Sequence, residues 1–493
     1  MTALTTVRFA LAGTRTDSVR ILLTALGAGA ATLGLLAVAT VLSIPTGGGD
    51  NPDAYYTNGL LAEPGLRPGP SVALVLTTIP VLFFVAQCSR LGAPARDRRL
   101  AAFRMGGATP AQTARIAATE TGVAAALGAL LGAAVYFAGR AVLDAPGPSG
   151  MRPLPTDVLP PLAVMVAILV GIPVLAIALS LLLMRRVSVT PFGVVRRSRD
   201  KKVRPWPGVL VVVGLGGWVA FTAAGRVFQT QDAVESGRLF LRLGVVCTLL
   251  VALGLALGTG WIAYTLGRLL HRVGRRPAAL LAGRRLMADP WAGSRLLGVI
   301  VITTLFGSGA AAVHSVFATG FRADDLSDRA FTKMSGEEYL PRDTSFYETA
   351  FDLIQLAVVV ALTVAVASLL VMLAEQLVTR RRSLAALVAG GTPRPVLARA
   401  QLLQTVAPLV PAVLLATAAG TVMAFSALGR EVRGGEFCDA AGNCTPPVTL
   451  TVPIPWADLA VIAGGSVLAV LVVTAIGLLF LRSSTDVAEL RTE

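Results

Sequence analysis

Ten long stretches that are nearly free of charge constrain this chain more than any other feature of its sequence. Each is about as long as, or longer than, the roughly 18 apolar residues that mark a membrane-spanning helix. Overall 54% of the residues are hydrophobic and only 14% are charged, whereas soluble domains are about 25% charged. A soluble enzyme and a disordered protein are thereby excluded, and we predict an all-α polytopic membrane protein. The ten predicted transmembrane helices lie at about 21–44, 71–89, 113–139, 159–184, 207–225, 240–267, 296–319, 349–374, 396–428 and 457–481.

The distribution of basic residues predicts the orientation of these helices. An even number of spans places both termini on one side, and cytosolic loops carry the excess of Lys and Arg. With a cytosolic N-terminus, 31 of the 43 Lys and Arg lie on the cytosolic side. The net charge of +15 is therefore mainly a topology signal, with a share for anionic lipid, and does not indicate a nucleic-acid partner. We predict a multi-pass protein of the bacterial cell membrane with both termini in the cytosol.

The four cysteines agree with this orientation. Cys88 and Cys247 fall within spans, where a small buried hydrophobic residue is expected. Cys438 and Cys444 share a predicted outer loop, 429–456. A disulfide suits an oxidising exterior and is favoured over metal binding, because two cysteines without a histidine make only half a zinc site.

The two halves of the chain share a cytosolic sequence. Residues 98–110 (RRLAAFRMGGATP) follow the second span, and residues 382–393 (RSLAALVAGGTP) follow the eighth. The offset between the copies is 284 residues up to the paired glycines. Both copies enter the membrane from the cytosol, so the repeat is parallel rather than inverted. We therefore predict two four-helix repeats joined by a two-helix insert.

Each copy predicts a cytosolic elbow, in which one short helix stops and a second begins. Leu100 and Phe103, like Leu384 and Leu387, are three residues apart and so share a helix face. Paired glycines favour a left-handed end to that helix, and the threonine and proline that follow predict a capped start for the next one. A solvated basic loop is the alternative for a single copy, but duplication favours the elbow. The turn residues are Gly106, Gly107, Thr109 and Pro110 in one copy and Gly390, Gly391, Thr392 and Pro393 in the other.

Short amphipathic segments precede both repeats and predict helices along the inner membrane surface. They contain the sequences RFALAG at 8–13 and ALLAGRR at 279–285. The predicted organisation is an N-terminal interfacial helix at 1–20, a first four-span unit at 21–184, a linker and two-span insert at 185–270, a second interfacial helix at 271–295, a second four-span unit at 296–481 and a cytosolic tail at 482–493.

These features resemble the FtsX-like permease family of ABC transporters, which includes MacB, LolC/E and BceB. The coupling segment of that family has the pattern R-x-x-E-[LIA]-[AG]-x-L-R-x-[LM]-G-[AG]-[ST]-x-x-Q and lies between the second and third spans of a four-span unit. Residues 99–110 are close to this pattern, and residues 382–393 are a degraded copy. The acid of the pattern is absent from both copies, and Val388 replaces the arginine present as Arg104. Unequal engagement of the ATPase by the two copies is therefore expected.

The resemblance implies a permease subunit that is not itself an enzyme. ATP and Mg would be bound by a separate ABC ATPase in two copies, so no cofactor is expected in this chain. The implied cargo is an amphiphile, such as an antimicrobial peptide, lipid or lipoprotein, that is exported, extracted or released at the outer face. The candidate ATPase-coupling residues are Arg98, Arg99, Leu100, Phe103, Arg104, Gly106, Gly107, Thr109, Pro110, Arg382, Leu384, Leu387, Gly390, Gly391, Thr392 and Pro393.

The arrangement of four, two and four spans is most similar to BceB-type permeases, which carry an extracellular domain between spans seven and eight. In this chain that position holds only about 28 residues, 320–347, with six acidic and four basic side chains. We expect this loop to be a solvated amphipathic segment. A weakly acidic collar that meets a cationic peptide or an accessory protein is the alternative.

Few residues in the sequence indicate a catalytic or ligand-binding role. No G-x-x-x-x-G-K-[ST] phosphate-binding loop is present, and no nucleophile–histidine–acid set is visible. Ionisable side chains within spans are costly and so are functional candidates. Glu120 is the clearest, with a packing hydrogen bond to Arg115 or to a neighbouring span as the structural alternative. Gln404 is its near-equivalent in the second repeat, Glu375 is expected to pair with Arg380 or Arg381, and His314 is expected to be a packed helix residue.

Two other classes of function stay open. The first is a signalling lever that uses ATP to act on an external hydrolase or a sensor kinase and transports nothing. Short outer loops argue mildly against it, because such levers reach outward with a folded domain. The second is a proton-coupled carrier, for which Glu120 alone is thin support.

Overall fold

The computed structural model describes residues 15–45, 56–62, 67–88, 105–107, 109–145, 151–185, 205–227, 233–336, 338–342, 344–379, 381–438 and 444–479. Within these ranges nine helices are long and apolar enough to cross a membrane. The prediction of an all-α polytopic membrane protein is confirmed. Helix α4 (Pro68–Cys88) occupies the second predicted span and is not counted among these nine.

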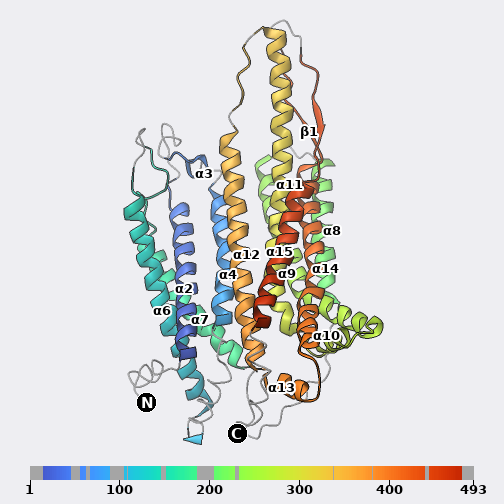
Figure 1. Cartoon of the computed structure of the whole chain (residues 1–493). Helices are drawn as coiled ribbons and strands as arrows, with labels where there is room; N and C mark the ends of the chain where they lie inside the picture. Colours follow the sequence, from blue (N-terminus) through green and yellow to red (C-terminus); the bar gives the residue numbers. More distant parts are fainter. Residues whose placement is uncertain are drawn as a thin grey trace. The chain divides into compact units, whose positions relative to one another are not determined.

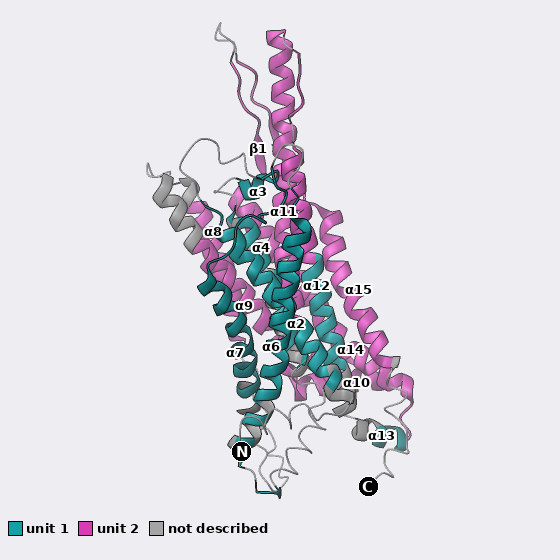
Figure 2. Cartoon of the chain, turned by 90° about the vertical axis from the view of Figure 1, so that its left-hand side faces the viewer, with its two compact units in different colours: residues 1–199, 359–390, 479–493 teal, residues 200–358, 391–478 magenta. Residues whose placement is uncertain are grey.

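The chain forms two compact units, coloured separately in Figure 2. Helix α12 (Ser345–Thr379) is divided between them, since residues up to 358 belong to unit 2 and residues from 359 belong to unit 1. The other elements of unit 1 are α2 (Arg15–Leu42), α3 (Gly59–Ala62), α4, α6 (Pro110–Leu143), α7 (Leu162–Arg185) and α13 (Arg381–Ala389). Those of unit 2 are α8 (Trp206–Val227), α9 (Ala233–Val273), α10 (Pro277–Ala288), α11 (Pro290–Ser335), α14 (Arg394–Leu428), β1 (Glu431–Arg433), β2 (Thr449–Thr451) and α15 (Trp456–Leu479).

Unit 1 is organised around α2, which packs against α4, α6 and α7 (Figure 1). The contact between α2 and α6 is made by backbone rather than by large side chains. A Cβ added at Gly128 would overlap the carbonyl oxygen of Ala25, and one added at Gly132 would overlap that of Gly29. Small residues four apart allow such an approach between helices in lipid, where packing and polar contacts replace the hydrophobic effect. Further along the same pair, the hydroxyls of Thr40 and Tyr136 lie 2.6 Å apart and are buried.

Unit 2 repeats this pairing between its own helices α11 and α14. A Cβ at Gly420 of α14 would overlap the carbonyl oxygen of Leu305 in α11. The inserted helices belong to this unit, since α9 packs against α8, α10, α11 and α14. Trp218 of α8 also donates its indole N–H to the carbonyl of Met423 in α14, at 2.8 Å. The two-helix insert is thus part of the core of unit 2.

Helix α11 continues well past its predicted span, and the predicted loop beginning at residue 320 is wrong in its first half. The helix runs to Ser335, where Gly336 takes a left-handed conformation (φ 73°) and ends it. Its 46 residues correspond to about 69 Å, more than twice the ~30 Å of a bilayer core. The extension is helical because it carries the i,i+4 ion pair Asp325–Arg329 and packs against the hairpin of β1 and β2.

Two buried or half-buried arginines order the outer end of unit 1. The guanidinium of Arg67 is buried and donates to the carbonyls of Ile44, Pro45, Leu61 and Ala62 at 2.7 to 3.1 Å. In the same way Arg140, at the end of α6, donates to three carbonyls of the segment 155–158. Such a fork of donors satisfies loop backbone that has no partner strand.

Tyr56 joins the two loops of this outer end. Its hydroxyl donates to Asp157 at 2.9 Å. Burial of the ring and this hydrogen bond raise the pKa of Tyr56, so its hydroxyl stays a donor across the physiological range.

Replacing Gly128 with alanine tests the backbone contact between α2 and α6. We expect Gly128→Ala to destabilise the protein by about 1–3 kcal/mol, the usual cost of overpacking a tight contact. The thermal midpoint of the protein in detergent should fall accordingly. Gly139→Ala is the matched control, since it lies on the same helix and nothing is within 4 Å of its added Cβ. Equal midpoints for the two variants would contradict the contact.

Candidate coupling elbows and a buried ion pair

The first elbow enters α6 through a tight, well-capped turn. Gly107 has a φ of 90°, a left-handed conformation that glycine adopts at little cost. The hydroxyl of Thr109 accepts from the backbone N–H of Gln112 at 3.3 Å, and the side chain of Gln112 accepts from the N–H of Thr109 at 2.8 Å. Pro110 occupies the first turn. The reciprocal pair is a capping box, which fixes the direction in which α6 leaves the turn.

The surface of this elbow is exposed as far as it is described. Met105 is 85% exposed, and Gly106 and Gly107 are exposed beside it. A single exposed apolar side chain is common on protein surfaces, so Met105 is a candidate contact point only because of its place in the elbow. The predicted coupling residues Arg98, Arg99, Leu100, Phe103 and Arg104 lie outside the described residues.

The second elbow has the same turn but a different cap. Helix α13 ends at Ala389, the N–H of Gly390 donates to Ala386, and Gly391 has a φ of 85°. Pro393, rather than Thr392, is the capping residue of α14, and no side chain caps this helix. The prediction that Thr392 caps α14 and that Pro393 opens it is therefore wrong. A second proline, Pro395, takes the first turn, so that the helix starts one residue later than expected.

The remaining residues of the second elbow are less fully described. The backbone of Arg382 and Leu384 lies in α13, but their side chains are outside the described part. Leu387 is half-buried. The boundary between the two compact units falls between Gly390 and Gly391, so this elbow is where the chain passes from one unit to the other.

A buried ion pair joins α2 and α6 on the same side of unit 1 as the first elbow. The carboxylate of Glu120 contacts the guanidinium of Arg20, and both residues are only 3% exposed. Glu120 follows Thr109 by 11 residues, or about 16 Å along the helix. Arg115, one of the partners considered for Glu120, is exposed. The partner is instead on a neighbouring span, and its signal in the sequence is the position of Arg20 at the start of the first span.

The second unit carries an uncharged counterpart. Gln404 of α14 is half-buried, and within the described part its side-chain carbonyl oxygen has no hydrogen-bond partner. The side chain of Glu375 and the residue Arg380 lie outside the described residues, so the predicted pairing there stays a prediction. The structure joins Cys438 and Cys444 by a disulfide in the segment that connects β1 to β2, which leaves neither thiol for a metal ion.

Comparison with known families identifies the segment that contains the first elbow. Residues 71–189 match the family model described as FtsX-like permease C-terminal. This part of the chain is therefore an FtsX-like permease C-terminal domain. The matched residues run from within α4, through the elbow and α6, to just beyond α7. No curated protein matches the chain.

The FtsX-like domain gives the elbow and Glu120 a functional setting. FtsX-like permeases are non-catalytic membrane subunits that generally work with a separate ABC ATPase. The described part of the elbow leads directly into α6 at Pro110. Glu120 lies further along this same helix.

Removing one member of the buried pair should be costly. We expect Glu120→Gln to destabilise the protein by about 3–5 kcal/mol, because it leaves the guanidinium of Arg20 buried without its carboxylate. The double variant Arg20→Met/Glu120→Gln should regain most of this loss. Unfolding by denaturant titration in detergent measures both. Arg342→Gln, which breaks an exposed pair, should cost less than about 1 kcal/mol; an equal loss in Glu120→Gln and Arg342→Gln would contradict the role of burial.

Proposed function

We propose that this chain is the membrane subunit of an ABC transporter and that both elbows transmit the movement of a separate pair of ATPase subunits. The observation that carries this proposal is the FtsX-like domain at 71–189, which contains the first elbow. The second elbow supports it, because Gly107 and Gly391 both take left-handed conformations at positions 284 residues apart. A solvated loop gives no reason for the same turn to occur twice.

The proposed coupling route runs through α6. Closure of the ATPases on ATP would press on the first elbow, and the capping box at Thr109 would pass that force into α6 rather than dissipate it in a loose turn. The Arg20–Glu120 pair and the backbone contact at Gly128 then oblige α2 to move with α6. The second elbow lacks a side-chain cap, which supports unequal engagement of the two copies.

The proposed orientation and cargo follow from charge and from the family. The excess of Lys and Arg on the side of the elbows favours a cytosolic position for them in a bacterial cell membrane. ATP and Mg would be held by the partner ATPase. The cargo we propose is an amphiphile taken from the membrane or its outer face, because the described part of the chain consists mainly of long apolar helices.

Substitution of the elbow tests this function directly. The chain is reconstituted in lipid with the ATPase encoded beside it, and ATP turnover and co-purification are measured. We expect Met105→Asp, and likewise Leu100→Asp/Phe103→Asp, to reduce stimulated turnover at least tenfold, since a charge replaces the apolar contact. Leu340→Asp is the control, because Leu340 is equally open (82% exposed) but lies in unit 2, far along the chain. An ATPase that does not co-purify with the wild-type chain and whose turnover the chain does not change would contradict the proposal.

A signalling lever is a second candidate that one observation favours. The extension of α11 beyond residue 319, the segment 338–342 and the hairpin of β1 and β2 together form a small outer subdomain that the sequence does not predict. A lever needs such a rigid projection to act on an external protein. Replacing Phe331 and Phe437, whose rings are 5.7 Å apart, with alanine would loosen this subdomain. Loss of signalling without loss of amphiphile transport would favour the lever over the transporter.

A further inference from the structure

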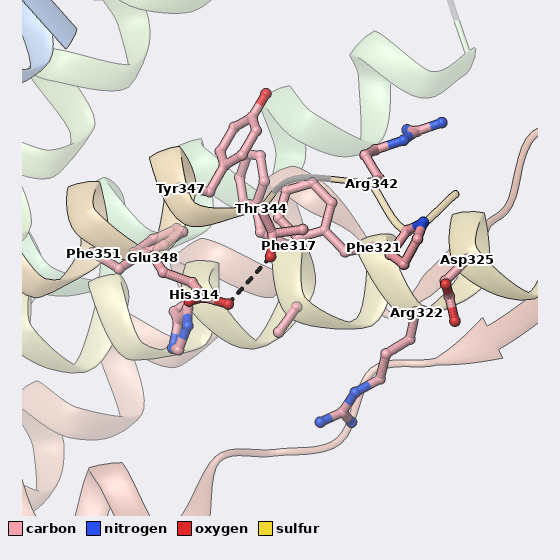
Figure 3. A pocket seen from close by; sticks show the side chains of 12 residues that line it. His314, Phe317, Phe321, Arg322, Asp325, Arg342, Thr344, Tyr347, Glu348 and Phe351 are labelled. Atoms are coloured by element: carbon pink, nitrogen blue, oxygen red, sulfur yellow. Dashed lines mark hydrogen bonds between the residues drawn. The ribbon is translucent and has the colours of Figure 1, made fainter. Parts of the chain in front are cut away.

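A pocket of about 350 Å³ lies in unit 2, where α11 passes the start of α12. Residues 314 to 325 of α11 form one wall, and residues 341 to 351 form the other (Figure 3). From Leu297, the first residue of the apolar stretch of α11, His314 is about 25 Å and Arg322 about 37 Å along the helix. The pocket therefore spans the predicted boundary between the outer leaflet and water.

Aromatic rings make up the middle of this pocket. Phe317 and Tyr347 stack with their ring centroids 6.0 Å apart, and Phe351 lies 5.8 Å from Phe317. Phe317 and Tyr347 are more than a third exposed, so part of each ring remains open to a ligand. Such rings attract an organic cation through the negative potential of their faces.

Several charged side chains around the rings are already paired with other residues of the protein. Arg342 is held by Asp324 and Asp328 at 3.3 and 3.4 Å. Asp325 is held by Arg329 at 3.0 Å and accepts from the hydroxyl of Tyr339. These contacts neutralise three of the acids that the sequence offered as a collar.

Two charged residues of the pocket stay open. Glu348 accepts only one hydrogen bond among the described residues, from Thr344 at 3.2 Å, and Arg322 forms no ion pair there. Glu348 lies at the His314 end of the pocket and Arg322 at the Asp325 end, as Figure 3 shows. Along the pocket, Glu348 thus comes from the membrane end and Arg322 from the water end, and the positions of the aromatic residues lie between them.

We propose that this pocket receives an amphiphile whose cationic group adjoins its apolar part, with any anionic group farther out toward water. The cation lies against Phe317 and Tyr347 and is paired by Glu348. An outer anion is paired by Arg322. As a substrate-receiving site the pocket rests on the transporter function proposed above, but as a binding site it requires no ATPase.

The order of the two charges distinguishes this ligand from a resident lipid. In a phosphocholine lipid the phosphate adjoins the tail and the ammonium lies outside, which would set like charges against like in this pocket. An alkyl sulfobetaine has the opposite order and matches it. Two zwitterions of equal net charge and similar size therefore give opposite expectations.

Photolabelling of the full chain in lipid nanodiscs tests the proposal. Four probes share one diazirine-bearing dodecyl chain and differ in the head group, which is sulfobetaine, phosphocholine, trimethylammonium or sulfate. Labelling is mapped by mass spectrometry of peptides that cover 314–325 and 344–351. We expect the sulfobetaine and trimethylammonium probes to label these peptides roughly fivefold more than the phosphocholine and sulfate probes, as a cation–π contact with an exposed ion pair allows.

Three variants assign that preference to named side chains. Glu348→Gln should abolish the advantage of both cationic probes. Arg322→Gln should lower sulfobetaine labelling alone and leave trimethylammonium labelling unchanged. Glu431→Gln, an exposed acid on β1 of the same unit, is the control and should change neither. Equal labelling by all four probes, or a preference that survives Glu348→Gln, would overturn the proposal and leave the rings as an interfacial aromatic belt.

The outcome is independent of the test of ATPase coupling. Charge-ordered labelling without ATPase stimulation would support the site and contradict the transporter function. ATPase stimulation, together with labelling that does not depend on the order of the charges in the head group, would support the transporter function and contradict the proposed binding site. Phe317→Ala should reduce labelling by every probe, and its thermal midpoint shows whether the fold survives that larger change.

Discussion

Close backbone contact between helices is the constraint on which the rest of this molecule depends. In lipid, apolar side chains gain little by leaving their surroundings, so helices associate where their backbones approach and their polar groups meet. Gly128 and Gly132 give α6 that approach to α2, and Gly420 gives it to α14 against α11. Where α2 and α6 are this close, Arg20 and Glu120 are buried and form an ion pair. The ion pair is thus a consequence of the small residues beside it.

The same close contacts bear on how the two elbows would act in the proposed coupling. A force applied at the first elbow would enter α6 through the capping box at Thr109. Within unit 1, α6 and α2 are in direct backbone contact, so the two helices would move together. The helix of the second elbow starts without such a cap. The two copies of the elbow therefore differ in stiffness, although they share the left-handed glycine that makes the turn.

Much of this architecture could be predicted from the sequence, because hydrophobic length and turn residues act locally. The spans, the helical start at Pro110 and the left-handed turns at Gly107 and Gly391 follow from patterns of a few residues. Tertiary features could not be predicted in the same way. Arg20 and Glu120 are 100 positions apart, and the spacing Gly128-x-x-x-Gly132 shows that α6 can pack closely but not against which helix. The extension of α11 also escaped prediction, since its charged residues indicate only that it leaves the membrane.

Because α11 is uninterrupted, the position of its outer end depends on the tilt of its inner end. Helix α11 runs without a break from Pro290 to Ser335, so a tilt of its inner part would displace its far end as well. Its inner end is packed in unit 2 by backbone contact with α14. A small rotation about that fixed point becomes a wide sweep at the far end. The aromatic rings near Phe317 lie part-way along this arm, where the same rotation would alter their spacing from Tyr347. Occupancy of the pocket would therefore be linked mechanically to the tilt of α11.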